Sequence, residues 1–325
     1  MTSQTAPDFA MIKAAAQRLS GHVRRTPLLN APLLDRIAGR RVYVKAECLQ
    51  WTGSFKFRGA WSALTALSVQ DQRRGVIAYS SGNHAQGVAY AASLLGAPAV
   101  IVMPQDAPAI KIANTRAYGA EVILYDRATQ DRDALGADLA AQRSLTLIRP
   151  YDEPLVIAGQ ASVGLEIAQQ ATEAGIGSAD VVVCCGGGGL TAGVALALEA
   201  KAPRLRVRTA EPAGFEDTAR SLALGVVQRN AAASGSICDA IVTPEPGKIT
   251  FPILQRLCGP GLVVSDAQVL QAMALAFAHL RIVVEPGGAV ALAAALFCPD
   301  LPETVICTAS GGNVDTEMFR RALSG

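Results

Sequence analysis

The chain has 325 residues, 50% of them hydrophobic and 17% charged, which is enough apolar sequence for two globular domains. Its 29 basic and 27 acidic residues leave a formal net charge of +2 and form no dense basic block, so we expect no nucleic-acid partner. The seven cysteines show no CxxC pair or zinc spacing and predict free thiols in a reducing cytoplasm. Neither a signal peptide nor a membrane-spanning run is evident, and we expect a cytoplasmic protein without a membrane partner.

The predicted elements begin with a helix over residues 7–21, a strand over 41–46 and a helical run over 60–67. From residue 75 onward, strands and helices alternate regularly. The predicted strands cover residues 75–79, 99–103 and 121–125, and the predicted helices cover 83–95, 110–118 and 129–142. This alternation predicts a small parallel sheet with helices on both faces.

A second alternating segment follows residues 147–151. It predicts helices over 159–174, 191–201, 266–280 and 289–297, and strands over 180–185, 206–211 and 304–308. Between these elements, residues 212–250 show little periodicity and are predicted to be loop with short helices.

The order of the elements predicts an α/β protein with two open, mainly parallel α/β domains. Because the first strand precedes the small unit, a large discontinuous domain is expected to comprise residues 1–74 and 151–325. Residues 75–150 would then form a small inserted domain. A cleft between the two domains is the natural ligand site.

Residues 53–60 form a basic and aromatic stretch between the strand over 41–46 and the following helix. In this stretch Lys56 lies between Phe55 and Phe57. One interpretation is a solvated surface charge, the usual state of a lysine. The other is an amine partly desolvated by its aromatic neighbours, whose lowered pKa leaves it free to form a Schiff base.

Four consecutive glycines follow the predicted strand over 180–185 and precede the next helix: Gly186, Gly187, Gly188 and Gly189. Because glycine permits unusual backbone angles, their amides can converge on a phosphate, and the helix N-terminus adds positive partial charge. A tight turn without a ligand is the simpler alternative. A nicotinamide-dependent oxidoreductase is another, since Gly187, Gly189 and Ala192 loosely fit the nucleotide fingerprint and Glu211 ends the next strand.

Two further polar segments lie just past predicted strands. One of them opens the helix over 83–95 and contains Ser80, Ser81, Gly82, Asn83 and His84. Its hydroxyls and amides can hold an anion such as a substrate carboxylate, although a serine there can also be an ordinary helix cap. His84 is as easily structural as catalytic. The other segment, residues 310–313, follows the last strand, so three strand-end loops are expected to face one cleft.

Taken in order, these segments resemble the fold-type II pyridoxal-phosphate enzymes of the threonine/serine dehydratase and serine racemase family. The resemblance runs from about residue 12 to residue 315, and its motifs are residues 45–47, 53–60, 80–86, 157–160, 186–190, 285–286 and 310–313. It implies that Lys56, next to Phe55, holds pyridoxal 5'-phosphate (PLP) as a Schiff base, and that the four glycines with Leu190 hold its phosphate. It further implies that Asn83 bonds the ring hydroxyl and Ser310 the pyridine nitrogen.

The resemblance also implies how a substrate is held. Residues 80–84 would bind the substrate carboxylate, and Ser81 would be the acid/base group on the side opposite Lys56 in racemisation. Arg132 would reach a second carboxylate on a ligand. On the sequence alone, Arg132 is equally a surface charge on its helix.

The loop over residues 211–217 resembles the acidic loop that binds Mg²⁺ or Ca²⁺ in the racemase branch of the family. The expected ligands are the carboxylates of Glu211 and Asp217 and the backbone carbonyl of Phe215, since oxygen ligands suit a hard cation. Two solvated acids are the alternative.

Cys48 and Trp51 depart from the family's pattern and put the pocket rim near Lys56 in doubt. Cys238 and Ala240 replace the family's alanine and glycine on either side of Asp239 and put the contact made by that loop in doubt. The segment after residue 313 is short, so no isoleucine feedback through a C-terminal regulatory domain is expected.

The resemblance implies a PLP-dependent L-threonine/L-serine dehydratase, an ammonia-lyase that eliminates the β-hydroxyl and forms 2-oxobutyrate or pyruvate plus ammonia. Serine racemisation and 3-hydroxyaspartate dehydration are the alternatives within the same chemistry. A non-catalytic binding protein is the alternative from another class. The small-molecule partner is expected to be a β-hydroxy amino acid, and the assembly a homodimer or homotetramer.

Overall fold

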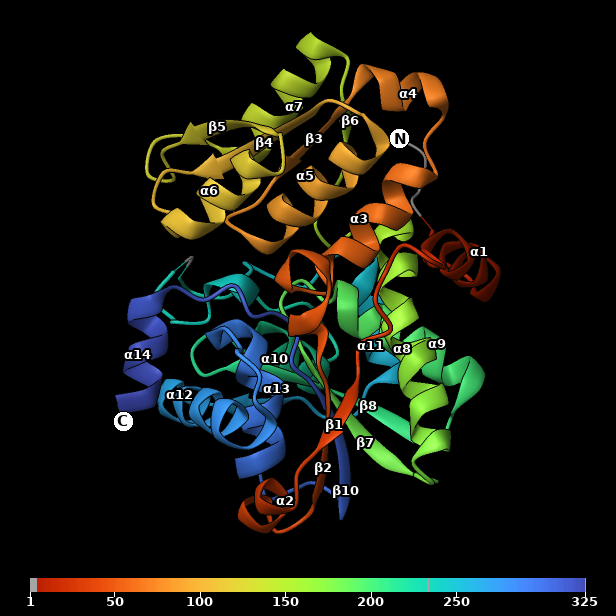
Figure 1. Cartoon of the computed structure of the whole chain (residues 1–325), viewed down its shortest axis with the longest axis vertical. Coiled ribbons are helices and arrows are strands. Elements are labelled where there is room, and N and C mark those ends of the chain that lie inside the picture. The colour runs from red at the N-terminus through yellow and green to blue at the C-terminus, as the bar shows by residue number, and fades with distance from the viewer. Residues whose placement is uncertain (1–4, 233, 325) are drawn as a thin grey trace.

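The computed structural model describes residues 5–232 and 234–324 and has two lobes, each built on its own sheet (Figure 1). The smaller sheet has the strand order β5-β4-β3-β6, and the larger has the order β1-β2-β10-β7-β8-β9. Strand β1 runs antiparallel to β2, while the other ladders between described strands are parallel. The predicted α/β class with two mainly parallel sheets is confirmed.

The small sheet is built from short apolar strands, and its two central strands, β3 and β4, are buried along their whole length. Its strands are β3 (Val76–Tyr79), β4 (Ala99–Pro104), β5 (Glu121–Tyr125) and β6 (Thr146–Leu147). Its connecting helices are α5 (Asn83–Leu95), α6 (Ala109–Ala117) and α7 (Arg132–Arg143). Helix α5 ends at Gly96, whose positive φ of 64° suits glycine.

The large sheet contains β1 (Leu28–Asn30), β2 (Arg41–Lys45), β7 (Ala179–Cys184), β8 (Leu205–Pro212), β9 (Leu262–Val264) and β10 (Thr304–Thr308). Helices α8 (Pro154–Glu173) and α9 (Gly189–Lys201) cover one face, and α12 (Asp266–Leu275) and α13 (Pro286–Phe297) cover the other. Alternate side chains of β7 meet the two layers, since Val181 packs in the α8 and α9 cluster and Val182 in the α13 cluster.

The other helices are α1 (Phe9–Leu19), α2 (Pro32–Ala38), α3 (Lys56–Thr65), α4 (Val69–Arg74), α10 (Asp217–Leu224), α11 (Thr250–Leu257) and α14 (Thr316–Ser324). Helix α3 leads from the large sheet to the small lobe, and its residues Phe57, Trp61 and Leu64 share one hydrophobic cluster with the small sheet. The domain boundaries at residues 74 and 151 stay a prediction.

Several elements differ from the prediction for identifiable reasons. Strands β1 and β9 have three residues each, too few to show a pattern. Helix α8 begins at Pro154 rather than at residue 159, because proline is favoured in the first helical turn. The predicted helix over 266–280 is α-helical only to Leu275, and its last turn is a π-helix that ends where Arg281 takes a φ of 62°.

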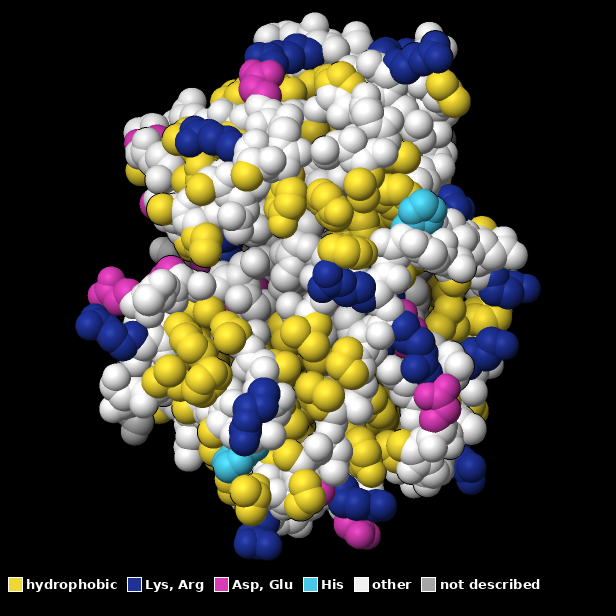
Figure 2. All heavy atoms as spheres, viewed as in Figure 1, with side chains coloured by type: hydrophobic (Ala, Val, Ile, Leu, Met, Phe, Trp, Pro, Cys, Tyr) yellow, Lys and Arg dark blue, Asp and Glu magenta, His cyan; other side chains and the backbone are white. Residues whose placement is uncertain are grey.

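The surface of one face carries scattered basic side chains between larger apolar areas (Figure 2). Among the described residues, no helix combines the length and the apolar character needed to cross a bilayer.

Candidate active site

A cavity of about 890 Å³, its open mouth included, lies where the loops of the two sheets meet. The small lobe contributes residues 79–84, Lys111 and Arg132. The large lobe contributes Phe55, Lys56, Pro150, Tyr151, Cys184, the residues from Gly186 to Leu190, the residues from Asp239 to Thr243, and Ser310. The structure therefore brings the predicted lysine, glycine loop, serine segment and Arg132 to one cavity.

Lys56 is the first residue of helix α3, and its amine lies inside the cavity wall. Its Nζ donates to the Pro150 carbonyl at 2.8 Å and lies 5.3 Å from the centre of the Phe55 ring. Burial lowers the pKa of Lys56 to about 8. At pH 7 about one amine in ten is then neutral. This environment agrees with the reactive amine and contradicts the solvated surface charge.

The glycine loop connects β7 to helix α9, with Gly188 at φ 88° as the residue before the helix. A Cβ at Gly187 would collide with the Tyr151 ring, and one at Gly189 would lie 3.0 Å from Gln160 Oε1. Only glycines therefore fit this turn. The amide of Gln160 and the hydroxyl of Thr191 are buried beside the loop without a hydrogen-bond partner. A glycine turn at a helix N-terminus with unused polar groups fits a phosphate.

Asn83 begins helix α5 of the small lobe and is held in one orientation by two residues of the large lobe. Its Nδ2 donates to Glu285 Oε1 at 2.5 Å, and its Oδ1 accepts from Asn313 Nδ2 at 2.8 Å. The other oxygen of Glu285 accepts from Lys111 Nζ at 2.8 Å. Desolvation lowers the pKa of Lys111, but the attraction of Glu285 outweighs it and the pKa is raised. Lys111 stays charged, and the ion pair joins the small lobe to the large lobe.

Ser81 and His84 have different environments within one loop. The Ser81 hydroxyl donates to Asp239 Oδ2 at 3.1 Å. His84 is buried, with Nε2 at 2.9 Å from the Ile148 carbonyl. Desolvation and then the charge of Lys56 lower the pKa of His84 to about 3. His84 is therefore neutral, which favours its structural interpretation over an acid/base role.

A hydrogen bond within the same loop joins Gly82 to Ser80, since the Gly82 amide donates to Ser80 Oγ at 3.0 Å. Lys111 lies against this turn, since a Cβ at Gly82 would collide with its side chain. Ser310 lies in the wall at the large lobe and is buried, with its amide 3.2 Å from the Gly288 carbonyl.

Arg132 begins helix α7 and is half-buried in the cavity wall. Its guanidinium carbon lies 4.8 Å from the centre of the Tyr79 ring, in a cation–π contact. Because it lines the same cavity as Lys56, Arg132 is placed to contact a bound anion. A plain surface charge would not have this position.

Glu211 and Asp217 are buried outside the cavity, next to helix α10. The Glu211 carboxylate accepts from the amides of Thr218 and Ala219 at 2.9 and 2.7 Å. Desolvation and then the charge of Asp217 raise the pKa of Glu211 well above its usual value. Glu211 therefore caps a helix and does not face the cavity, so it is not placed as the ribose-binding acid of an oxidoreductase.

Asp217 accepts from Asn230 Nδ2 at 2.6 Å, while its Oδ2 is buried without a hydrogen-bond partner. Desolvation raises its pKa to about 6. The backbone of Phe215 lies in the same turn. Two buried carboxylates with raised pKa values contradict the solvated-acid alternative and fit a cation. Within the described chain, no cluster of three histidine, cysteine or acidic ligands occurs.

Of the departures from the family's pattern, Cys48, Trp51 and Cys238 lie outside the described cavity wall, whereas Ala240 lines the cavity. Cys48 and Cys238 are buried, and Trp51 is partly exposed at the surface, where Arg24 stacks on its ring at 3.8 Å. Cys48, Trp51 and Cys238 therefore do not alter the pocket rim, whereas Ala240 forms part of the wall beside Asp239.

A buried lysine of lowered pKa and a glycine turn at a helix N-terminus line one cavity between two α/β lobes, an arrangement that fits a PLP-dependent enzyme. The family model described as pyridoxal-phosphate dependent enzyme matches residues 19–311, and the chain belongs to this family.

Relatives extend over nearly the whole chain. The L-threo-3-hydroxyaspartate ammonia-lyase of Pseudomonas sp is 42% identical over 96% of this chain and 97% of its own length. The serine racemase of Schizosaccharomyces pombe is 36% identical over 98% of both chains. The solved structure of maize serine racemase matches with a TM-score of 0.91 and 34% identity, covering 98% of this chain and 97% of the other. The solved T.th. threonine deaminase matches with a TM-score of 0.89 and 44% identity, covering 95% of this chain and 99% of the other. The homologues are thus PLP-dependent ammonia-lyases and racemases.

Proposed function

We propose that the protein is a PLP-dependent ammonia-lyase that acts on β-hydroxy amino acids and prefers L-threo-3-hydroxyaspartate to L-threonine and L-serine. The observation that carries the proposal is the presence of the Lys56 amine and the Arg132 guanidinium in one cavity wall. Two relatives, at 42% and 38% identity, are described as L-threo-3-hydroxyaspartate ammonia-lyases. Threonine and serine, which the resemblance favours, become secondary substrates.

The residues of the cavity fit PLP. Lys56 would hold it covalently, the glycine turn with Leu190 would hold its phosphate, and Asn83 and Ser310 would contact the two polar edges of its ring, with Phe55 alongside. When bound, PLP supplies an electron-withdrawing ring that stabilises negative charge at the α-carbon of the substrate.

Lys56 is the proposed general base. Its Nζ would take the α-proton of the bound substrate, because burial keeps a useful fraction of this amine neutral near pH 7. A double bond forms between the α- and β-carbons as the β-hydroxyl leaves with a proton as water. Hydrolysis of the resulting enamine releases a 2-oxo acid and ammonia.

Arg132 is the proposed selectivity residue. Its planar guanidinium can donate two hydrogen bonds to the second carboxylate of hydroxyaspartate, a group that threonine and serine lack. The serine segment, residues 80–84, would hold the α-carboxylate, with the ammonium of Lys111 beside it.

Racemisation is a second candidate activity, because the Ser81 hydroxyl lines the cavity and is bonded to a carboxylate. When Ser81 takes the α-proton, its own hydroxyl proton could pass to Asp239, so that the hydroxyl stays neutral. We also propose a Mg²⁺ or Ca²⁺ site at Glu211, Asp217 and the Phe215 carbonyl. The cytoplasmic location and the homodimer or homotetramer stay predictions.

The test is to incubate the purified full-length protein, loaded with PLP, with L-threo-3-hydroxyaspartate, L-threonine and L-serine and to measure 2-oxo acid formation. We expect the highest kcat/KM with hydroxyaspartate. Turnover of threonine and serine alone would reject the substrate, and no 2-oxo acid from any of the three would reject the lyase.

A further inference from the structure

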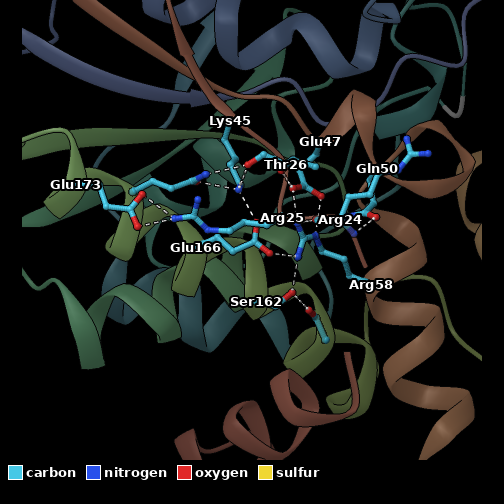
Figure 3. Close-up of polar contacts among 12 residues, drawn as sticks. Arg24, Arg25, Thr26, Lys45, Glu47, Gln50, Arg58, Ser162, Glu166 and Glu173 are labelled. Carbon is cyan, nitrogen blue, oxygen red and sulfur yellow. Dashed lines mark hydrogen bonds and ion pairs between the residues drawn. The ribbon is translucent and has the colours of Figure 1, made fainter. Parts of the chain in front are cut away.

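Figure 3 shows a cluster of charged side chains that includes Arg58 of helix α3. Its members are Lys45, Glu47, Arg58 and Glu166, whose side chains are 0%, 0%, 0% and 15% exposed. Arg58 follows Lys56 by two positions in α3, and residues two apart project from nearly opposite sides of a helix. We call these four residues the Arg58 cluster.

Arg58 makes two forked ion pairs. Its Nε and Nη2 donate to the two oxygens of Glu47, each at 2.8 Å. Its Nη1 and Nη2 donate to the two oxygens of Glu166 at 2.6 and 2.9 Å. The fifth N–H, on Nη1, donates to Ser162 Oγ at 3.1 Å, and Nη2 also contacts the Arg24 carbonyl at 3.1 Å. Such paired hydrogen bonds fix both the orientation of the guanidinium plane and its distance from the two carboxylates.

Lys45 completes the cluster from the end of strand β2. Its Nζ donates to Glu166 Oε2 at 2.5 Å, to the Thr26 carbonyl at 2.7 Å and to Gln170 Oε1 at 2.9 Å. Two cations thus meet two carboxylates, and the formal charges cancel. Among the buried polar atoms of the described chain that lack a hydrogen-bond partner, none belongs to these four residues.

Four buried charges stabilise a fold inefficiently, because each charge loses its hydration on burial. Apolar residues of similar size often stabilise the fold equally well. A fully hydrogen-bonded charge cluster does, however, enforce one geometry, since any displacement leaves a buried charge unpaired. This property suits a segment whose position matters for chemistry.

The Arg58 cluster holds both ends of the segment that carries Lys56. Lys45 and Glu47 precede this segment, Arg58 follows it, and Glu166 anchors it to helix α8. Along the segment, the Cys48 amide donates to the Ala309 carbonyl at 2.8 Å and the Phe55 amide donates to the Ser310 carbonyl at 3.1 Å. These backbone hydrogen bonds join the segment to the loop that contains Ser310, while the Arg58 cluster holds its two ends.

Helices α3 and α8 touch closely at this place. A Cβ at Gly59 would lie 2.8 Å from the side chain of Val156, and one at Gly159 would collide with the Arg58 carbonyl. With so little space, α3 can turn or slide on α8 only if the Arg58 cluster breaks.

We propose that Arg58 is a positioning residue, which through its forks to Glu47 and Glu166 sets the place of the Lys56 amine relative to the glycine turn. The inference rests on the proposed function and requires no contact of Arg58 with cofactor or substrate. Arg58 acts through geometry rather than charge, since burial alone accounts for the lowered pKa of Lys56.

The test variant is Arg58→Lys, which keeps the positive charge and loses both forks. Its matched control is Arg25→Lys. Arg25 makes a similar pair with Glu173 of α8 at 2.8 Å, but both side chains are about half exposed (Figure 3), and exposed pairs contribute little. Each full-length protein is freed of cofactor and mixed with PLP. Lys56 Nζ bonds to the aldehyde carbon, the aldehyde oxygen leaves as water, and the change in absorbance gives the rate.

Arg58→Lys should slow covalent attachment by about tenfold to a hundredfold, with the midpoint of its pH dependence still near 8 as in the wild type. Pyridoxamine 5'-phosphate has the same ring and phosphate but no aldehyde, so its affinity should stay within about twofold. Arg25→Lys should change neither quantity. An unchanged attachment rate, or a parallel loss of pyridoxamine 5'-phosphate affinity, would overturn the positioning role.

A second variant, Lys45→Met with Glu166→Gln, keeps the test decisive if Arg58→Lys does not fold. It removes one charge of each sign and leaves the fork between Arg58 and Glu47 intact. It should also slow attachment, and a folded double variant with the wild-type rate would overturn the proposal. If wild-type protein attaches no PLP at Lys56, the proposed function fails instead.

Discussion

Replacement of Arg132 by leucine should separate the substrates by their second carboxylate. Arg132 is half-buried in the cavity wall, so a bond from it to a carboxylate is screened less than one at the surface. A charge-assisted hydrogen bond of this kind contributes roughly 1.5–3 kcal/mol. Its loss should lower kcat/KM for L-threo-3-hydroxyaspartate about 10- to 150-fold. L-threonine has no second carboxylate, and its kcat/KM should change less than about threefold.

The assay follows 2-oxo acid formation with both substrates at matched cofactor content. Arg143→Leu is the control, because Arg143 ends the same helix α7 and pairs with Glu121 at 2.8 Å on the surface. It should leave both substrates unaffected. Equal losses on hydroxyaspartate and threonine in Arg132→Leu would refute the role of Arg132 as a selectivity residue.

Four further predictions concern Lys56, Asp217, a divalent cation and Ser81. Between pH 6 and 9, the rate of PLP attachment to cofactor-free protein should rise with a midpoint near the Lys56 pKa of about 8; a flat profile would contradict the buried amine. The pKa of Asp217 is about 6 in the folded state, raised from 3.8. Without divalent cations, the free energy of unfolding should therefore fall as the pH rises from about 4 to 6. Mg²⁺ should raise the unfolding temperature at pH 7 and Asp217→Asn should remove that response, whereas a wild-type protein indifferent to Mg²⁺ and chelator would reject the site. Ser81→Ala should abolish D-serine formation from L-serine while retaining most L-threonine dehydration; equal loss of both would mean that Ser81 serves elimination as well.

The sequence could predict the alternating strands and helices because buried parallel strands carry continuous apolar runs, as β4 and residues 181–184 of β7 do. It could also predict Lys56 and the glycine turn, since both belong to short contiguous motifs. The roles assigned to these residues remain predictions, but the structure brings the residues to one cavity.

Pairings between distant segments could not be predicted. Lys111 meets Glu285, which is 174 positions away, and Lys45 meets Glu166, which is 121 away. No local pattern shows that such charges are buried together. Asp239 was likewise missed as the partner of Ser81, 158 positions apart. A local sequence signal does mark the position of Glu285, because Glu285 directly precedes Pro286 in the first turn of α13.

The central claim is that the Lys56 amine holds PLP and performs the chemistry. The most direct measurement is peptide mass spectrometry of full-length protein treated with PLP and borohydride, together with 2-oxo acid formation by Lys56→Ala. We predict a reduced PLP adduct on Lys56 and, in Lys56→Ala, loss of both the adduct and the activity. An adduct on another lysine, or 2-oxo acid formation by Lys56→Ala at the wild-type rate, would contradict the account.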